Sequence, residues 1–171
     1  MKISKCVLIF LTTVVIPAFA SAAPETPQGK ITQAANSAEI LPAALAQAKS
    51  QNKKVMVLFS GLEWCMPCRV FDKNVIKKPV FEKFARNELV LVEFDMKRNG
   101  AVSLATNAKE PSAPAVSDTE IKRQARLLMD KFGVRGVPCA VILDGDGREI
   151  FRHEGCGIGA EDFVKAVRDA K

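Results

Sequence analysis

The stretch that decides the fold runs from Lys54 to Cys68 and reads KVMVLFSGLEWCMPC. Its first part, residues 54–59, is a nearly continuous apolar run, as expected of a strand that is buried on both faces. Cys65 and Cys68 follow, and two thiols at this spacing can close a small disulfide and reopen it. A helix that begins at Cys65 would stabilise its thiolate, the reactive form, through the positive end of the helix dipole. The stretch therefore predicts a strand, a redox-active cysteine pair and a helix, in that order.

Helix and strand patterns alternate along the rest of the chain. Apolar residues at helical spacing predict helices over residues 39–51, 68–86, 119–132 and 160–170. Apolar runs predict further strands over residues 89–95, 139–143 and 149–153, the last two joined by a turn at residues 144–147. Pro79 is expected to break or kink the second helix, and Thr119 to cap the third. This order predicts an α/β fold with a mixed central sheet flanked by helices.

One segment does not fit the alternation. Residues 97–118 are rich in Ala, Ser, Pro and Asn and carry no sustained period. A loop of about 20 residues is uncommon inside a compact domain, and such loops are usually functional or mobile. We interpret the segment as a mobile insertion in the fold, ahead of the alternative that it is a flap that contacts substrate.

The first 23 residues have the pattern of a secretory signal peptide. Lys2 and Lys5 precede an apolar stretch shorter than the roughly 20 residues that span a bilayer, and small residues at 20–23 offer cleavage sites. We therefore expect an exported protein, periplasmic or secreted, with no stable membrane insertion after cleavage; a retained anchor is the minority alternative. Residues 24–37 are interpreted as a flexible mature N-terminus, and residues 38–171 as one domain.

Charge and cysteine content narrow the class of partner. The formal net charge is +6, but the basic residues are scattered rather than clustered. The sequence therefore predicts no nucleic-acid partner and no polybasic membrane segment. Signal cleavage would remove Cys6 and leave four cysteines, an even number that permits two disulfides in an exported protein.

A second motif accompanies the cysteine pair. Residues 133–138 read GVRGVP and precede another apolar strand. The order strand, WCxPC, helix, strand, helix, GVRGVP, hairpin, helix resembles the thioredoxin superfamily over roughly residues 38–170. The sequence FSGLEWC at residues 59–65 is most similar to the exported members of that superfamily. The resemblance implies a thioredoxin-like fold, with the insertion around residues 97–118, and thiol-disulfide exchange.

The resemblance also implies a role for each matching residue. Cys65 matches the exposed nucleophilic thiol at the helix N-terminus, and Cys68 matches the buried resolving thiol. Pro138 matches the cis-proline that faces the disulfide and helps to dock an extended substrate backbone. The expected docking surface is formed by Trp64, Met66, Pro67, Val137 and Pro138.

The chain departs from cytoplasmic thioredoxins where those carry a buried Asp and a Lys that pairs with it. Alignment on Phe59 puts Leu58 at the Asp position and Leu91 at the Lys position. Deprotonation of Cys68 must then rely on Glu63, on water or on a group of the substrate, and Glu63 is the candidate residue for this proton transfer.

Two further cysteines lie at the ends of the predicted hairpin. Because an antiparallel hairpin brings its ends together, we predict a second disulfide between Cys139 and Cys156. The alternatives are free buried thiols, a second redox couple, or a soft-metal site shared with the first cysteine pair. His153, the single histidine, is expected to face solvent from the last strand.

These observations predict an exported thiol-disulfide oxidoreductase that reduces or exchanges protein disulfides. Pro67 gives the motif the form found in reductants, and the absence of a histidine beside the nucleophile favours the same direction. The expected partners are protein disulfide substrates and a membrane thiol-transfer protein that supplies electrons. No cofactor and no resident metal is expected. The alternatives are an oxidase or isomerase of disulfide folding, and a non-enzymatic binding module or copper carrier in which Met66 adds a soft ligand.

Overall fold

The computed structural model describes residues 39–107 and 116–171. The predicted signal peptide (1–23) and mature N-terminus (24–37) lie outside the described residues, and the start of the domain at residue 38 stays a prediction. Across the described ranges no helix is long and apolar enough to cross a membrane.

The predicted helices and strands occur in the predicted order, with one further strand between the second strand and the third long helix. The helices are α1 (Ile40–Gln51), α2 (Met66–Phe71), the π-helical segment η1 (Asp72–Ile76), α3 (Pro79–Glu88), α4 (Asp118–Lys131) and α5 (Ala160–Asp169). The strands are β1 (Lys54–Ser60), β2 (Leu89–Met96), β3 (Val102–Thr106), β4 (Cys139–Leu143) and β5 (Glu149–Glu154). The predicted α/β architecture is confirmed.

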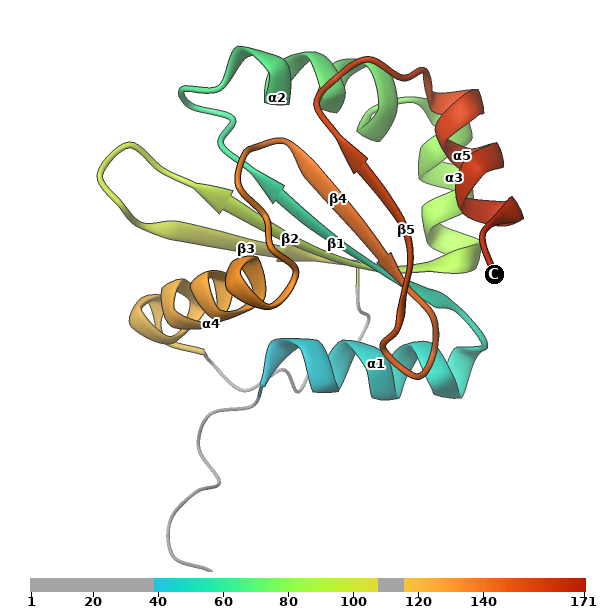
Figure 1. Ribbon diagram of the computed structural model, residues 1–171, viewed down its shortest axis with the longest axis horizontal. Helices are drawn as coiled ribbons and strands as arrows, with labels where there is room; N and C mark the ends of the chain where they lie inside the picture. The colour runs from blue at the N-terminus through green and yellow to red at the C-terminus, as the bar shows by residue number, and fades with distance from the viewer. Residues whose placement is uncertain (1–38, 108–115) are drawn as a thin grey trace, which may run out of the picture. The chain divides into compact units, whose positions relative to one another are not determined.

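The strands form one mixed sheet in the order β3-β2-β1-β4-β5 (Figure 1). The central strand β1 pairs with β2 in parallel, with Leu58 opposite Glu93, and with β4 in antiparallel, with Phe59 opposite Cys139. The edge strands β3 and β5 each pair in antiparallel with their neighbour. Because β1 lies at the centre, the loop that follows it, which carries the cysteine pair, is held by paired strands on both sides.

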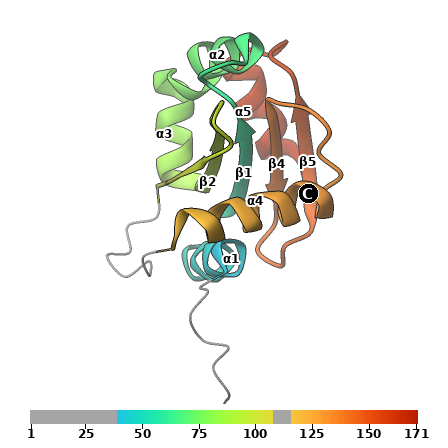
Figure 2. The same cartoon turned by 90° about the vertical axis from the view of Figure 1, so that its left-hand side faces the viewer.

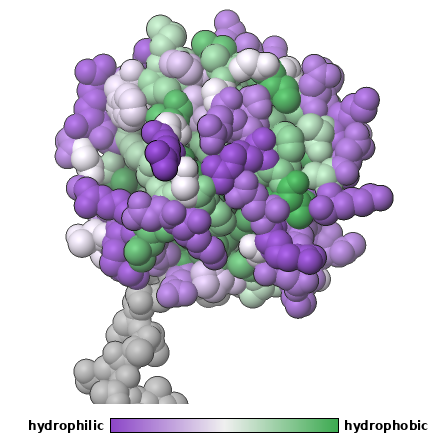
Figure 3. All heavy atoms as spheres, in the orientation of Figure 1, coloured by the Kyte–Doolittle hydropathy of each residue, from purple (hydrophilic) through white to green (hydrophobic). Residues whose placement is uncertain are grey.

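Helices cover both faces of the sheet, and this explains why β1 is apolar at almost every position. Val55, Val57 and Phe59 point into one core, which α1 and α4 close; Met56 and Leu58 point into a second core, which α2, η1, α3 and α5 close (Figures 1 and 2). A strand buried on both faces cannot alternate apolar with polar residues. In contrast to these two apolar cores, the outer face seen in Figure 3 is mostly hydrophilic and has only small apolar areas.

The helical run after the cysteine pair is divided as predicted. The segment α2–η1 ends at Ile76, and Pro79 stands at the first position of α3, where its missing N–H costs no hydrogen bond. The predicted cap of the next long helix is wrong by two residues. Ser117, not Thr119, is the N-cap of α4, and its hydroxyl accepts a hydrogen bond from the Glu120 N–H at 3.3 Å.

The interpretation of residues 97–118 as a loop is wrong for its described part, which contains a strand. After a tight turn in which Gly100 has a φ of +79°, residues 102–106 return as the edge strand β3. This strand pairs with β2 from Met96↔Val102 to Val92↔Thr106. The insertion therefore begins as a β-hairpin that widens the sheet, and residues 108–115 lie outside the described part.

Candidate active site

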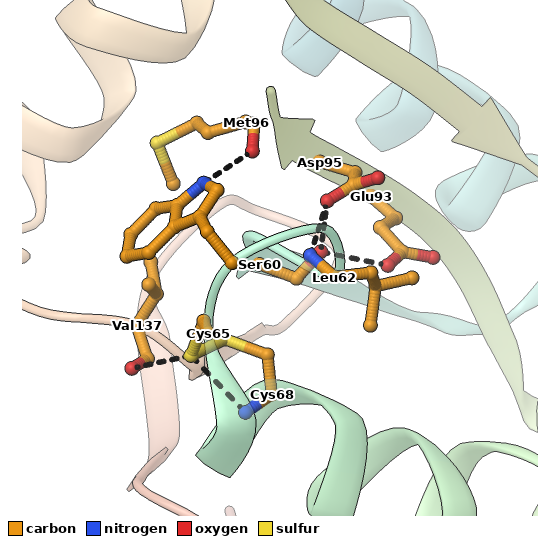
Figure 4. Close-up of a disulfide and its surroundings, with 9 residues drawn as sticks. Ser60, Leu62, Cys65, Cys68, Glu93, Asp95, Met96 and Val137 are labelled. Atoms are coloured by element: carbon orange, nitrogen blue, oxygen red, sulfur yellow. Dashed lines mark hydrogen bonds between the residues drawn. A yellow bond between two sulfur atoms is a disulfide. The ribbon is translucent and has the colours of Figure 1, made fainter. Parts of the chain in front are cut away.

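Cys65 and Cys68 are joined by a disulfide at the start of α2 (Figure 4). Cys65 is the N-cap of this helix, and its Sγ accepts a hydrogen bond from the Cys68 N–H at 3.1 Å. Pro67, in the first turn, has no N–H, so the Cys68 N–H is the donor available to the sulfur. A helix N-terminus and a directed N–H both favour negative charge. This geometry can therefore stabilise a Cys65 thiolate once the disulfide is reduced.

The two sulfurs differ in access. Cys65 keeps 6% of its surface exposed and Cys68 keeps 1%. The order agrees with an outer attacking thiol and an inner resolving thiol, although in the disulfide state Cys65 is more buried than the resemblance implied. An incoming sulfur can reach Cys65 but not Cys68.

The loop before β4 lies against the disulfide. The Val137–Pro138 peptide bond is cis, as the resemblance implied, and the Val137 carbonyl oxygen is 3.5 Å from Cys65 Sγ. Pro138 is buried and Val137 is half-buried. The predicted docking residues of this loop are thus brought next to the outer sulfur, and the Val137 carbonyl can accept a hydrogen bond from the reduced thiol.

Exposed apolar side chains surround the outer sulfur. Trp64 is 44% exposed and Met66 is 61% exposed, and Pro67 beside them is also exposed. The indole of Trp64 packs over Gly61, where an added Cβ would come within 2.6 Å of the ring, and its N–H donates to the Met96 carbonyl at 2.8 Å. Exposed apolar patches of this kind mark surfaces that bind partners.

A carboxylate that the sequence reasoning missed holds the loop before Cys65. Asp95, at the end of β2, is 8% exposed and accepts hydrogen bonds from the Leu62 N–H at 2.8 Å and the Ser60 hydroxyl at 3.4 Å. Lys97 balances its charge through an ion pair. Asp95 therefore positions the turn that delivers Trp64 and Cys65 (Figure 4).

A second missed carboxylate, Glu93, lies on the sheet face that α2 and η1 cover. It stands directly opposite Leu58 in the parallel pairing, whereas Leu91 stands opposite Met56. Its carboxylate accepts a hydrogen bond from the Ser60 hydroxyl at 3.0 Å. Burial raises the pKa of Glu93, the Ser60 hydrogen bond opposes that shift, and the nearby charges of Asp95 and Asp72 add to it. Two acidic positions in an otherwise apolar strand were the signal available in the sequence.

Glu63, the predicted proton-transfer residue, is exposed. Its carboxylate accepts a hydrogen bond from the Arg98 N–H at 3.2 Å and lies 3.9 Å from the Lys97 ammonium. These contacts direct the carboxylate toward the β2–β3 turn. Its assignment as a base stays a prediction.

The predicted Cys139–Cys156 disulfide is wrong in this structure, where both thiols are free. Cys139 packs in the core closed by α1 and α4, whereas Cys156 packs against the core on the opposite face of the sheet. The strand partner of Cys139 is Glu154, and the chain turns at Gly155 before it reaches Cys156. Burial raises the pKa of the Cys139 thiol to about 11, so this thiol is unreactive at neutral pH.

The prediction that His153 faces solvent is wrong. It is half-buried, and its ring stacks on Phe71 of α2 with 5.7 Å between centroids. Its Nε2 is buried with no hydrogen-bond partner in the described part of the chain, and burial lowers its pKa. Residues 39–107 and 116–171 contain no group of three His, Cys, Asp or Glu side chains placed to hold a metal ion.

Comparison with known proteins agrees with this geometry. A family model described as thioredoxin-like domain matches residues 41–171. Two similar proteins come from Chlamydia pneumoniae. The thioredoxin-related protein DsbJ is 29% identical over 109 residues, which are 64% of this chain and 27% of that protein. The disulfide bond reductase DsbH is 25% identical over 127 residues, which are 74% of this chain and 68% of that protein. The chain thus spans about a quarter of the length of DsbJ.

Solved structures share the fold. A structure of the DsbH oxidoreductase has a TM-score of 0.58 at 22% identity and covers 86% of this chain and 96% of its own. The reduced C-terminal domain of DsbD from Neisseria meningitidis has a TM-score of 0.51 at 18% identity and covers 77% of this chain and 94% of its own. At these identities the likeness establishes the architecture.

Proposed function

The chain belongs to the thioredoxin-like domain family, and from this premise we propose that it is an exported thiol-disulfide oxidoreductase that reduces protein disulfides. The observation that carries the proposal is the position of Cys65. It is the N-cap of α2, it accepts the Cys68 N–H, and it is bonded to Cys68 beneath an exposed apolar rim. Such a sulfur can alternate between thiolate and disulfide without a change in the fold.

The reaction follows from the difference in access between the two sulfurs. The Cys65 thiolate attacks one sulfur of a substrate disulfide, which forms a mixed disulfide and releases the other substrate sulfur as a thiolate. Cys68, held one helical turn away, then loses its proton and attacks Cys65. This second step releases the first substrate sulfur and leaves the Cys65–Cys68 disulfide. Two electrons pass from the protein to the substrate in each cycle.

Glu93 is the better candidate than Glu63 to take the proton from Cys68. Glu93 lies on the face of the sheet that α2 and η1 cover. Its pKa is raised mainly by burial, and the charge of Asp72, which follows Cys68 by one helical turn, adds to the shift. A half-buried carboxyl with a raised pKa is a stronger proton acceptor than an ordinary surface carboxylate. Glu63 is instead held by Arg98 and Lys97 at the surface.

The reducing direction and the exported location rest on separate observations. The WCxPC motif lacks the histidine that makes such disulfides strongly oxidising, and one similar protein is named a disulfide bond reductase. The N-terminal sequence has the pattern of a signal peptide. In an oxidising compartment the protein needs a source of electrons, and a membrane thiol-transfer protein would supply them.

The decisive experiment is reduction of insulin disulfides with the wild-type protein and a Cys65→Ser variant. We expect turnover with dithiothreitol as donor for the wild type and the uncatalysed rate for the variant. A Cys68→Ser variant should instead accumulate mixed disulfides through Cys65 when it is expressed in its native compartment. Equal rates for the wild type and Cys65→Ser would overturn the assignment of the nucleophile.

The reduction potential separates the reductase from its enzymatic rival. A value near −270 mV, which is about that of thioredoxin, supports the reducing direction. A value near −120 mV, which is about that of a strong disulfide oxidant, would assign the protein to the oxidase or isomerase class. Stoichiometric Cu(I) binding without turnover of insulin would favour the non-enzymatic carrier.

A further inference from the structure

A pocket of about 200 Å³ lies between the β2–β3 turn and α4. The hairpin that begins the inserted segment forms one wall, and a stripe of α4 residues at helical spacing forms the other. Its lining residues are Met96, Lys97, Gly100, Ala101, Val102, Lys122, Ala125, Arg126 and Met129. Because the hairpin builds one wall, the pocket depends on the part of the chain that breaks the regular alternation.

The pocket adjoins the candidate active site. Met96 lines it, and the carbonyl oxygen of the same residue accepts the indole N–H of Trp64. Trp64 directly precedes Cys65, and Figure 4 shows Met96 on the side of the site away from Cys68. A polypeptide joined to Cys65 through a mixed disulfide can therefore extend past Trp64 toward the pocket, at about 3.3 Å per residue.

The size and lining of the pocket suit one apolar side chain. Small-molecule sites usually enclose about 300–1,000 Å³, and this pocket is smaller. Its floor is formed by aliphatic and thioether groups from Met96, Val102, Ala125 and Met129. Methionine side chains adapt to ligands of different shape, which suits a site that accepts more than one residue type.

The rim of the pocket is positively charged. Lys97 is balanced by Asp95 and Glu63, but neither Lys122 nor Arg126 forms an ion pair with a residue of the described ranges. The Lys122 ammonium lies against the hairpin turn, since a Cβ placed on Gly100 would be 3.3 Å from it. Two cations that form no ion pair with a described side chain, next to an apolar pocket, favour a ligand that carries negative charge beside an apolar group.

Resting on the proposed disulfide exchange, we propose that this pocket selects protein substrates in which an apolar side chain and an acidic residue lie close to the reacting cysteine. The apolar side chain enters between Met96 and Met129, and the acidic side chain faces Lys122 and Arg126. The occupant is a segment of the substrate protein itself. The pocket thus favours acidic disulfide substrates over basic ones.

The test uses synthetic peptides whose single cysteine carries an uncharged 2-thiopyridyl group, which the reduced protein releases by exchange. The peptides place Leu-Asp, Leu-Lys or Ala-Asp two to four residues from the cysteine, on either side. At low ionic strength we expect the Leu-Asp peptide to react about 5- to 10-fold faster than the Leu-Lys peptide, and high salt to reduce this ratio toward one. We also expect the Ala-Asp peptide to be slower than the Leu-Asp peptide.

Charge-reversal variants separate local recognition from net charge. The double variant Lys122→Glu/Arg126→Glu should invert the preference between the Leu-Asp and Leu-Lys peptides. The matched control, Lys83→Glu/Lys165→Glu, makes the same change in net charge at exposed positions of α3 and α5, behind the opposite face of the sheet. It should keep the wild-type preference. Equal effects of the two double variants would overturn the proposal, because the preference would then follow net charge alone.

A pocket-filling variant tests the apolar part. Ala101 is half-buried in the wall, and Ala101→Leu should remove the advantage of Leu-Asp over Ala-Asp while leaving the charge preference in place. An unchanged advantage would contradict the placement of the leucine. Wild-type binding to anionic lipid vesicles, with no discrimination between the peptides, would assign the cations to a membrane surface and overturn the proposal.

The mixed disulfide of 2-thiopyridine with N-acetylcysteine amide carries no charged group and serves as the substrate without flanking residues. All pocket variants should react with it at the wild-type rate. Failure of wild-type exchange with this compound, or exchange that does not need Cys65, would refute the proposed function instead. Failure of the pocket proposal can therefore be distinguished from failure of the proposed disulfide exchange.

Discussion

Among single residues, Glu93 combines features that rarely occur together. It is a half-buried carboxyl in an apolar strand, it is hydrogen-bonded to Ser60, and no cation is paired with it in the described ranges. Burial raises its pKa above the ordinary value of 4.5. A polar residue at a position where the strand pattern is apolar is expected at functional sites. This supports a role for Glu93 beside α2.

We predict that Glu93→Gln stabilises the oxidised protein at neutral pH. The Glu93 carboxyl ionises at a lower pH in the unfolded chain than in the folded protein, because its folded pKa is raised above 4.5. The wild-type protein therefore loses stability as pH rises from 4.5 to that folded pKa. Glutamine keeps the shape and the Ser60 hydrogen bond but has no charge to bury. Solvent reaches part of the carboxyl, so the gain should stay below about 1 kcal/mol at pH 7. Thermal unfolding between pH 4 and 7.5 measures it.

Glu82→Gln is the matched control, because Glu82 is an exposed glutamate on α3. It should change stability by less than about 0.5 kcal/mol across the same range. The proposed proton transfer has its own readout in the same variant. Release of substrate from the Cys65 mixed disulfide should slow at neutral pH in Glu93→Gln but not in Glu63→Gln. A Glu93→Gln protein less stable than wild type at pH 7 would contradict the linkage argument.

The sequence predicted the Cys65–Cys68 disulfide because such a bond depends on local spacing. It failed where the answer depends on pairing across the sheet. Glu93 comes next to Leu58 through the register of β1 with β2, which the local sequence pattern does not give. Cys139 and Cys156 lie near the same hairpin end but on opposite faces of the sheet, a distinction that strand ends alone do not reveal.

Among the elements, α4 shows how a helix start is chosen. Ser117 and Thr119 are both residues that cap helices, but Ser117 has extended backbone angles and Thr119 is already inside the helix. We predict that Ser117→Ala lowers the free energy of unfolding by about 0.5–2 kcal/mol, because the Glu120 N–H loses its acceptor. Urea denaturation should show a lower midpoint with an unchanged slope.

Thr119→Ala is the control for this cap. Thr119 is exposed in the first turn, where alanine has the higher helix propensity, so this variant should be neutral or slightly stabilising. If Thr119→Ala were the more damaging change, the helix would begin later than the structure shows. Because α4 forms one wall of the pocket beside the site, both variants should also keep the peptide preference at temperatures where the protein is folded.

Strand β3 was not predicted because its sequence carries only a weak strand pattern. Its sequence VSLAT has few strongly strand-forming residues, and as an edge strand it needs only one paired side. The signal that was present is Asn99-Gly100, a pair typical of hairpin turns, and Gly100 adopts the positive φ that such turns require. The strongly apolar strands were predictable because burial on both faces produces a continuous run of apolar residues.

At the scale of the whole molecule, the shifted pKa values combine into one stability profile. Hydrogen bonds from Arg123 lower the pKa of Glu120 to about 2, and the backbone N–H of Arg148 and the side chain of Arg152 lower those of Asp144 and Glu149. Their stabilisation is present above the unfolded values and is lost as pH falls. His153, with a lowered pKa, adds stability as pH rises toward 6.5. Glu93 alone among these groups acts in the opposite sense.

We predict that the oxidised protein is most stable between about pH 6.5 and 9, the ordinary pKa values of His153 and Cys139. Below this range the free energy of unfolding falls, because the unfolded chain binds protons at these carboxyl and imidazole groups more readily than the folded state does. Above pH 9 the Cys139 thiol ionises first in the unfolded chain, because burial raises its folded pKa to about 11, so stability falls again. Urea midpoints from pH 3 to 10.5 trace the profile.

Two variants should each flatten one side of that profile. Cys139→Ala should remove the decline between pH 9 and 10.5, and His153→Phe should remove the rise that ends near pH 6.5 while it keeps a ring against Phe71. Both residues belong to a sheet that the two cores share, so a loss of packing would lower the whole curve without changing its shape. A parallel downward shift at every pH would therefore show that neither group is responsible for the pH dependence.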